Sequence, residues 1–455
     1  MIYKKFTIKN FRCFSDEQSL LFATPVVGKI GSGITYIVGA NNSGKTTLIE
    51  GVCLRKDHKI KNSEKLAGKL PEFCLYDNEN ILKRKVELIR EESYTLVANP
   101  NIEDNKDLFE IISSRRHWES PASAISTVKE ALANAITGQT PRKPQNIAVA
   151  SILMKIEADP ARYQTFIDLV KRVIPEFTKW AVGYEENEYI EYISAAGTKH
   201  KTDYLGDGVI SVIRILTHLF EESTTALIID EPELSLHPLA QKRLIKLIAE
   251  YSQKRQIIIS THSPYFVNWE YLANGAILNR VAKTDDTSSK VHTLKDATNY
   301  ASLISGANWQ QPFLMDEVAK EIFFANDNIL FLEGQEDVGL LRSEFSDAEI
   351  HLFGYGVRGY NNFKLALTMA KDLGFQKVGA IIDKGENEDA IFSALCKEFA
   401  DYKIMQWNKN DIRDKESLTT VAKSGYFDSD GKKKPAALLD DFESKIKEIK
   451  GYFPT

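Results

Sequence analysis

The chain has 455 residues, enough for two or three domains that each bury a core of their own. Its hydrophobic content of 43% and charged content of 27% are ordinary for a soluble globular protein, and a net charge of −5 excludes a surface that clamps nucleic acid all over. The 4 cysteines include no C-x-x-C pair, which argues against zinc. The chain shows no apolar signal segment and no apolar run long enough for a membrane span, so we expect a cytoplasmic protein without a membrane partner.

Two strands are predicted near the N-terminus. Tyr3–Phe11 alternates in places between apolar and charged residues, as a half-exposed strand does, and Ile34–Val38 is a short apolar run. We expect the first strand to form an antiparallel edge beside the sheet that contains the second.

The segment Gly39–Thr46 follows the second strand, fits the pattern G-x-x-x-x-G-K-[ST] and precedes an expected helix over Thr46–Val52. Its glycines let successive backbone N–H groups point into one cavity, so phosphate is the expected ligand. Lys45 is expected to reach the β- and γ-phosphates and to act in catalysis, and the Thr46 hydroxyl to hold Mg²⁺. The competing interpretation is a chance glycine-rich turn. The predicted nucleotide-binding residues are Gly39, Asn41, Asn42, Ser43, Gly44, Lys45, Thr46 and Thr47.

From about residue 55 to 180 the composition changes, and we expect a largely helical insertion. The charge run Arg55–Lys61 is more typical of a solvated face or loop than of a DNA contact. Whether the insertion binds DNA stays open. Pro160–Ile174 carries apolar residues at helical spacing, which predicts a buried stripe.

Two further apolar runs predict buried parallel strands that end in polar residues. Ala226–Asp230 leads into Glu231, and Gln256–Ser260 leads into Thr261 and His262. Asp230 is expected to hold the water shell of Mg²⁺, and Glu231 to polarise the attacking water. His262 is expected to face the γ-phosphate, the alternative being a hydrogen-bonded core histidine.

The alternation of strands and helices begins again near the C-terminus. The run Ile329–Leu332 ends at Glu333, and Val378–Ile382 ends at Asp383, with helices expected between and after them. The whole sequence therefore predicts an α/β protein with a second, smaller α/β domain.

The N-terminal motifs resemble the ABC-type ATPase heads of the RecF, SMC and OLD proteins. The resemblance covers roughly residues 1–55 and 190–300 and includes Asn10-Phe11-Arg12, the Gly39–Thr46 loop, Asp230-Glu231-Pro232 and Ser260–Ser263. It implies an ATPase domain over 1–315 that uses ATP and Mg²⁺. It also implies a homodimer or higher oligomer in which a signature loop of one head completes the ATP site of another. The matching residues here are Gly206, Asp207 and Gly208, and the loop lacks the Ser and Gln of the transporter form.

Residues 316–455 resemble the TOPRIM domain that follows such a head in OLD nucleases. The resemblance implies Glu333, Asp337 and Asp383 as candidate metal ligands. In that family the second strand usually ends Asp-x-Asp, whereas this chain has Asp383-Lys384-Gly385, and Arg413 stands where an acid is common. A cation in place of carboxylates disfavours Mg²⁺, so we expect a degenerate domain that serves for docking.

The overall layout resembles the ATPase subunits of the two-component PARIS phage-defence systems. This resemblance implies an ATP-hydrolysing sensor and scaffold, a separate toxic effector nuclease as partner, and a phage protein as trigger. Two alternatives stay open. One is an OLD-type, ATP-gated, Mg²⁺-dependent DNA endonuclease that uses Glu333, Asp337 and Asp383, and the other is a RecF-type repair head.

Overall fold

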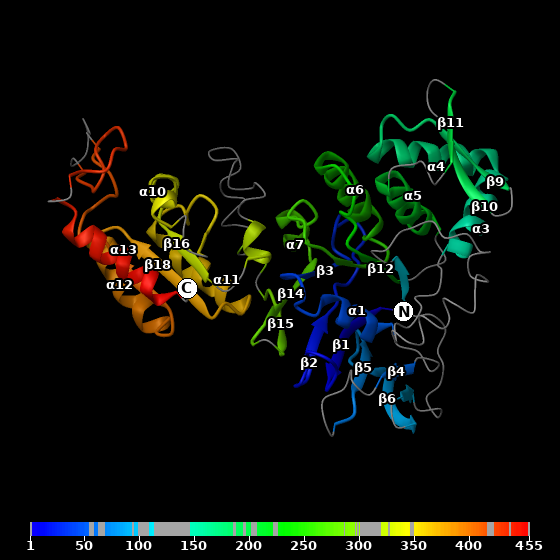
Figure 1. Ribbon diagram of the computed structural model, residues 1–455, viewed down its shortest axis with the longest axis horizontal. Coiled ribbons are helices and arrows are strands. Elements are labelled where there is room, and N and C mark those ends of the chain that lie inside the picture. Colours follow the sequence, from blue (N-terminus) through cyan, green and yellow to red (C-terminus); the bar gives the residue numbers. More distant parts are fainter. Residues whose placement is uncertain are drawn as a thin grey trace. The chain divides into compact units, whose positions relative to one another are not determined.

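The computed structural model describes residues 2–53, 59–61, 69–92, 95–98, 109–112, 146–184, 188–193, 197–201, 207–221, 226–285, 287–295, 297, 300, 320–325, 328–345, 350–415, 423–435 and 438–453. The chain divides into two compact units, one of Met1–Val38 with Asn42–Val291 and the other of Gly39–Asn41 with His292–Thr455. Figure 1 shows the ribbon coloured along the sequence. Both units combine helices with sheets, so the predicted α/β class is confirmed.

A 6-stranded sheet in the order β15-β14-β3-β13-β12-β8 contains the strands with polar ends. From β14 to β8 its neighbours pair in parallel. The strands β3, β12 and β13 are buried along their whole length, as their continuous apolar runs predict. The strands are β3 (Ile34–Val38), β8 (Glu110–Ile112), β12 (Ala226–Asp230), β13 (Gln256–Ser260), β14 (Ile277–Lys283) and β15 (Ser289–Thr293).

The pairing register brings the carboxyl ends of three strands to one edge of this sheet. Ile37 lies opposite Ser260, and Ser260 lies opposite Asp230. Parallel strands that end in register deliver their following loops to the same place. The loops after β3, β12 and β13 therefore start side by side.

The helices of the first unit start where local sequence signals place them. The Asp159 side chain caps α4 by accepting hydrogen bonds from the N–H groups of Ala161 and Arg162. The apolar stripe predicted for this helix is buried. The His237 side chain caps α6, with Pro238 in the first turn. The helices are α1 (Lys45–Val52), α3 (Asn146–Glu157), α4 (Pro160–Val173), α5 (Asp207–Phe220), α6 (Pro238–Tyr251) and α7 (Trp269–Ala273).

A second 6-stranded sheet is antiparallel throughout and has the order β2-β1-β5-β6-β7-β4. It corrects two expectations. First, β1 belongs to this separate sheet and is no edge of the parallel one. Second, the described part of the insertion contains strands between residues 59 and 112 in addition to the helices after residue 146, whereas we expected mainly helices. The strands are β1 (Tyr3–Lys9), β2 (Gln18–Leu21), β4 (Lys59–Lys61), β5 (Glu72–Asp77), β6 (Leu82–Glu92) and β7 (Thr95–Ala98).

The physical reason for the correction is visible in β5. Phe73 and Leu75 are buried at alternate positions, which is the period of a strand. Its partner β1 is distant in sequence, and this pairing supplies the hydrogen bonds that local pattern does not reveal. On the buried face, α1 packs against Phe6 and Ile8, where a Cβ on Gly51 would meet them at 3.0 and 3.2 Å.

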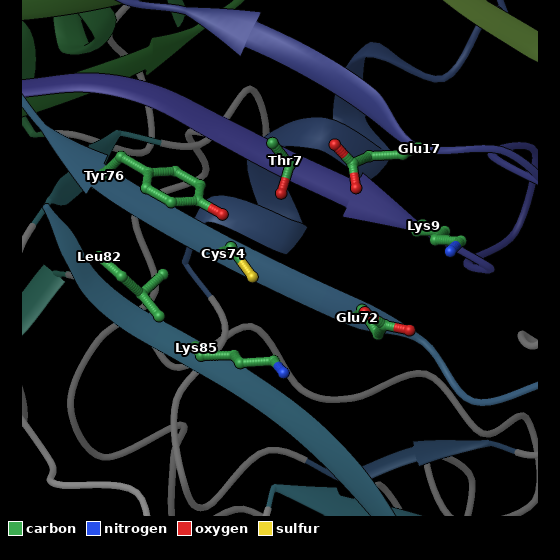
Figure 2. A pocket seen from close by; sticks show the side chains of 8 residues that line it. All are labelled: Thr7, Lys9, Glu17, Glu72, Cys74, Tyr76, Leu82 and Lys85. Atoms are coloured by element: carbon green, nitrogen blue, oxygen red, sulfur yellow. The ribbon is translucent and has the colours of Figure 1, made fainter. Parts of the chain in front are cut away.

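The other face of the antiparallel sheet carries a polar hollow of about 250 Å³ (Figure 2). Side chains from β1, β5 and β6 line it together with Glu17. These side chains include positively and negatively charged groups, a thiol and a phenol. The lining residues are Thr7, Lys9, Glu17, Glu72, Cys74, Tyr76, Leu82 and Lys85.

A third, 3-stranded sheet has the order β11-β10-β9 and is antiparallel. Its strand β9 delivers Trp180 onto Tyr163 of α4, with ring centroids 5.4 Å apart. The strands are β9 (Lys179–Tyr184), β10 (Glu188–Ile193) and β11 (Lys199–Lys201).

The second unit holds a 4-stranded, parallel sheet in the order β17-β16-β18-β19 (Figure 1, yellow to red). The strands are β16 (Asn328–Leu332), β17 (His351–Leu352), β18 (Lys377–Ile382) and β19 (Lys403–Gln406). The helices are α10 (Gln335–Leu341), α11 (Phe363–Asp372), α12 (Glu386–Glu398) and α13 (Asp440–Tyr452), with short 3-10 helices η5 (Glu321–Phe323), η6 (Arg342–Phe345) and η7 (Tyr360–Asn362). Trp407, Tyr426 and Phe442 pack together in its core. Within the described ranges, no helix is long and apolar enough to cross a membrane.

Candidate functional site

The loop between β3 and α1 has the backbone shape that its sequence predicts. Gly39, Asn42 and Gly44 have positive φ angles of 140°, 58° and 108°. Gly44 is the N-cap of α1 and has no side chain, so the first N–H groups of the helix are left for a ligand. A concave loop with such amides is suited to phosphate.

Gly44 also has no room for a larger residue. A Cβ built on it would meet the Cys13 thiol at 2.6 Å and the Phe14 ring at 3.1 Å. The segment that precedes β2 is therefore packed directly behind this loop. Arg12 of the same segment pairs with Glu50 of α1 at 2.5 Å, a tie that sequence analysis missed because the partners are distant in sequence.

Lys45 lies among the acids that follow β12. It is buried, and this burial lowers the pKa of its ammonium group to about 8, while Glu231, Asp230 and Glu233 each act to raise it. The structure thus brings Lys45 together with the two predicted acids and with a third that sequence analysis did not assign. Glu233 was the missed residue, and its signal was a third acid directly after Pro232.

Glu231 leaves β12 in a left-handed backbone conformation. Its φ is 49°, and its N–H donates to the Ser260 carbonyl at 2.8 Å. Such a conformation is uncommon for a residue with a side chain and is held here by the neighbouring strand. Asp230 stays buried at the end of the strand, so the two adjacent carboxylates are separated for different tasks.

His262 lies next to Glu231. The His262 Nε2 atom is 3.5 Å from Glu231 Oε1. Burial, with a smaller contribution from the charge of Lys45, lowers the pKa of the imidazole to about 4, so the ring is neutral near pH 7. A neutral imidazole beside a carboxylate can orient that group or donate a hydrogen bond to a phosphate oxygen.

The remaining predicted residues of this site differ in their exposure and packing. Thr46 is exposed, whereas Thr47 and Ser43 are buried. Gly208 starts α5 beside Asp207, and a Cβ on it would meet the Ser235 carbonyl at 2.4 Å, so it packs against the turn after β12. Gly206 lies outside the described residues.

The residues present fit a nucleotide with its magnesium ion. The Ser43 hydroxyl is buried and has no hydrogen-bond partner among the residues that the structure describes, at the loop where phosphate is expected. An ammonium group, a hydroxyl and carboxylates are the donor set that P-loop enzymes use for phosphates and Mg²⁺. Lys45 with the loop amides would hold the phosphates, and Thr46 with Asp230 would hold the ion.

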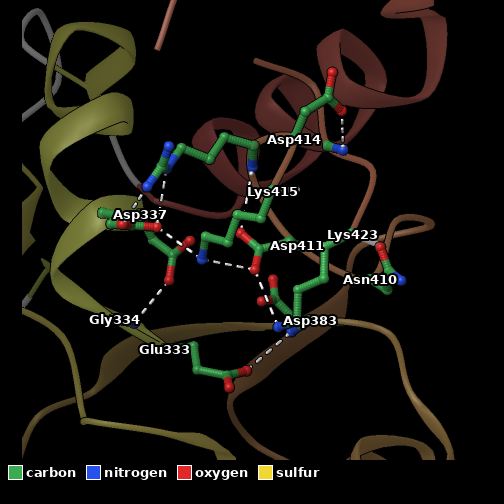
Figure 3. Close-up of polar contacts among 12 residues, drawn as sticks. Glu333, Gly334, Asp337, Asp383, Asn410, Asp411, Asp414, Lys415 and Lys423 are labelled. Carbon is green, nitrogen blue, oxygen red and sulfur yellow. Dashed lines mark hydrogen bonds and ion pairs between the residues drawn. The ribbon is translucent and has the colours of Figure 1, made fainter. Parts of the chain in front are cut away.

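The candidate metal ligands of the second unit also come together (Figure 3). Glu333 accepts a hydrogen bond from the Asp383 N–H at 3.3 Å, and Asp337 accepts one from the Gly334 N–H at 2.6 Å. Burial, and then the charges of Asp337, Glu333 and Asp411, raise the pKa of Asp383 to about 8. Burial likewise raises the pKa of Asp337 to about 7.

Lysines, however, accompany these acids. Lys415 and Lys423 reach Asp411 at 2.8 and 3.0 Å, and Asp411 is buried. Lys415 also pairs with Glu336 at 2.7 Å, as does Arg413 at 2.8 Å (Figure 3). Among the described residues, no group of His, Cys, Asp and Glu is arranged to hold a metal ion.

The residues of the second unit therefore do not fit a two-metal centre. We expected Lys384 to supply the unfavourable charge, but its side chain is exposed, and its main-chain N–H donates to the Lys409 carbonyl. The ammonium groups at the acids come from Lys415 and Lys423, which follow β19 in an irregular segment. No periodic pattern marks such a segment, so the position of these two lysines could not be predicted.

Comparison with known families supports the nucleotide site. A family described as "AAA domain, putative AbiEii toxin, Type IV TA system" matches residues 85–268, and another described as "AAA domain" matches residues 5–119. The first range contains Asp230, Glu231 and His262, and the second contains Lys45. The chain is therefore similar to AAA domains over these two ranges.

The more particular relatives share only parts of the chain. An OLD nuclease of Thermus scotoductus is 42% identical over 74 residues, which is 14% of this chain and 14% of that protein. An uncharacterized protein of Methanocaldococcus jannaschii is 25% identical over 148 residues, 32% of this chain and 17% of that protein. The chain thus spans less than a fifth of the length of either relative.

Solved structures of SMC heads are similar in fold. The SMC head domain from Thermotoga maritima is 16% identical, with a TM-score of 0.38 over 65% of this chain and 100% of that one. The Smc head domain bound to the C-terminal domain of ScpA, derived from Pyrococcus furiosus, is 15% identical, with a TM-score of 0.44 over 66% of this chain and 98% of that one.

Proposed function

We propose that the chain is an ATP-hydrolysing sensor and scaffold subunit of a bacterial anti-phage defence system, which holds and releases a separate toxic effector nuclease. The observation that carries the ATPase part is the placement of Lys45 among Asp230, Glu231 and Glu233, with His262 beside Glu231. These side chains start from three adjacent strand ends, where an α/β sheet binds its ligand.

The proposed chemistry assigns one task to each side chain. Lys45 and the amides of the loop bind the phosphates, and the ATP charge keeps the ammonium group protonated although burial lowers its pKa to about 8. Glu231 orients the attacking water and accepts its proton. Thr46 and Asp230 would hold Mg²⁺, which when bound would neutralise charge on the phosphates. His262 is neutral and donates to a phosphate oxygen. Two copies assemble through these heads, with Asp207 and Gly208 facing the partner's nucleotide.

The scaffold part rests on the second unit. Its acids are accompanied by Lys415 and Lys423, which leaves the ATP site as the centre where this chain performs chemistry. The toxic activity then belongs to a separate protein, and a phage protein acts as the trigger for release. The family description that names a toxin–antitoxin system is compatible with a role in defence.

An ATPase assay tests the first part. Wild-type protein is expected to release phosphate from ATP, and Lys45→Ala to lose nucleotide binding. Glu231→Gln is expected to bind ATP but to hydrolyse it at least ~100-fold more slowly, because the amide cannot accept a proton. Normal turnover in Glu231→Gln would show that the base is misassigned. For the defence role, cells with the wild-type gene and its neighbouring gene are challenged with phage, and Lys45→Ala should abolish any protection.

One observation favours a second candidate, an OLD-type endonuclease gated by ATP. It is the 42% identity to an OLD nuclease over 74 residues. Plasmid is incubated with the protein and Mg²⁺ or Mn²⁺, with and without ATP. Nicking that disappears in Glu333→Ala would support the nuclease, and intact plasmid in the presence of ATPase activity would exclude it.

A further inference from the structure

Glu233 uses both oxygens of its carboxylate on the loop that carries His262. Its Oε1 accepts from the His262 N–H at 2.6 Å, and its Oε2 accepts from the Thr261 hydroxyl at 2.8 Å. The first of these is short, as hydrogen bonds to a charged acceptor are. Both carboxylate oxygens are therefore bonded to the loop after β13.

The backbone after β12 is shaped to send this side chain back to β13. The left-handed Glu231 turns the chain, Pro232 follows, and the Leu236 N–H closes the turn on the Glu233 carbonyl at 3.0 Å. Thr261 is itself fixed from the other side, because its N–H donates to the Ile37 carbonyl of β3 at 3.1 Å. The carboxylate therefore joins two of the strand ends at the candidate site.

The same loop is tied to α6 by a second set of bonds. The Ser263 N–H donates to the Thr261 hydroxyl oxygen at 3.0 Å, and the Ser263 hydroxyl donates to Gln241 Oε1 at 2.6 Å. Gln241 in turn donates to the Leu236 carbonyl at 2.8 Å. The turn after β12 and the loop after β13 thus form one closed network of buried or half-buried hydrogen bonds.

This network sets where the imidazole lies. Residue 262 has its main chain held by Glu233 and its side chain 3.5 Å from Glu231. A loop held only by its ends would leave several rotamers and backbone positions open, whereas a buried bond to the amide fixes one. A misplacement of about 1 Å in a reacting group is costly for catalysis.

We propose that Glu233 is a positioning residue for ATP hydrolysis: it holds the main chain at Thr261 and His262 so that the imidazole stays against Glu231. This role rests on the proposed ATPase function. It makes the third acid of Asp230-Glu231-Pro232-Glu233 necessary for turnover, because it acts through the loop that carries His262.

Paired variants separate geometry from charge. Glu233→Gln keeps an oxygen for the His262 N–H and offers an N–H to the Thr261 hydroxyl, while Glu233→Ala removes both bonds. Thr261→Val removes the hydroxyl at equal size, while Thr261→Ser retains it. Glu270→Gln, an exposed glutamate at the start of α7, is the control. For each full-length variant we measure kcat and KM for ATP, Kd for a fluorescent ATP analogue, and Tm.

We expect Glu233→Ala and Thr261→Val to lower kcat at least about tenfold, with Kd within about threefold of wild type. Glu233→Gln and Thr261→Ser should retain at least about a third of kcat. The double variant Glu233→Ala/Thr261→Val should be no slower than the slower single variant, because both act on one network. If Glu233→Ala fails to fold, the kcat of Thr261→Val is compared with that of Thr261→Ser, and a loss in the valine variant alone would support the proposed role.

Three results would overturn this role. They are an unimpaired kcat in Glu233→Ala or in Thr261→Val, a loss in Glu233→Gln as large as in Glu233→Ala, and a change confined to Kd. The second would show that the charge acts and the hydrogen bonds do not. Wild-type protein without ATPase activity would overturn the proposed function and this role with it, whereas active wild type with an unimpaired alanine variant would overturn this role alone.

Discussion

Asp383 offers a sharp test of how the acids of the second unit are charged. It is 8% exposed, and its Oδ1 atom has no hydrogen-bond partner in the described part of the protein. Burial, followed by the charges of Asp337, Glu333 and Asp411, raises the pKa of the carboxyl group from 3.8 to about 8. The change to test is Asp383→Asn, which keeps the shape and removes the charge.

The sign follows from proton binding. Between pH 3.8 and about 8 the folded chain holds the proton at Asp383 while the unfolded chain releases it. The free energy of unfolding of the wild type therefore decreases as pH rises through this window, whereas Asp383→Asn lacks this titrating group and does not show the decrease. Glu336 acts in the opposite sense but at lower pH, because Arg413 and Lys415 lower its pKa to about 2, so it adds no slope above pH 5.

The magnitude can be bounded. One unit of pKa difference corresponds to about 1.4 kcal/mol, so the roughly three units between the ordinary value and pH 7 set a limit of ~4 kcal/mol. Asp337 reduces the effect of Asp383 alone, because burial, and then the charges of Glu333 and Asp411, raise the pKa of Asp337 to about 7. We therefore expect Asp383→Asn to stabilise the second unit by about 2 kcal/mol at pH 7.

Hydrogen exchange of the β18 amides measures this gain in the full-length protein. A stabilisation of about 2 kcal/mol should slow their exchange about 30-fold at equal pH, and the difference should grow between pH 6 and 8. Asp401→Asn, at an exposed carboxylate of the same unit, is the control and should change nothing. Exchange in Asp383→Asn as fast as in wild type, or a difference that shrinks as pH rises, would refute the reasoning.

Two further predictions concern the loop before α1 and the lysines of the second unit. Gly44→Ala should weaken binding of a fluorescent ATP analogue at least about tenfold, because φ is 108° and the new Cβ would lie 2.6 Å from a thiol. Gly28→Ala has a φ of 87° but open space around it, so it should bind the analogue normally, and equal losses in both would contradict a specific role of the loop. Lys415→Met/Lys423→Met should gain Mn²⁺ binding in calorimetric titration without nucleotide, because the buried acids lose their counter-charges. Lys384→Met should gain none, and Mn²⁺ binding by wild type at the same site would show that the lysines do not exclude metal.

The sequence was sufficient where structure is local. The runs 34–38, 226–230 and 256–260 are confirmed as buried strands with the bounds expected, because continuous apolar residues between polar flanks suit a sheet covered on both faces. It was insufficient where pairing is distant. The strand β5 pairs with β1, and Glu72 of β5 lies opposite Lys9, which is more than sixty positions earlier in the chain. The alternation of apolar residues within β5 is short, and in a segment rich in charged residues it did not predict a strand.

The same division applies to the sites. Lys45, Asp230, Glu231 and His262 were predictable as neighbours, because three adjacent parallel strands carry them to one edge. The role of Glu233 was not, since it depends on a left-handed residue at Glu231 that no propensity predicts.

Charge balance separates the two carboxylate clusters of this chain. In the first unit the single ammonium group of Lys45 lies among Asp230, Glu231 and Glu233, an excess of negative charge that a divalent cation can offset when a nucleotide enters. In the second unit Lys415 and Lys423 share Asp411, and Arg413 and Lys415 share Glu336, so internal cations already perform that task. A lysine cannot activate water as a metal ion does. On this charge balance the first cluster is suited to a divalent cation that arrives with a nucleotide, whereas the acids of the second cluster are already paired with lysines and an arginine of the same unit.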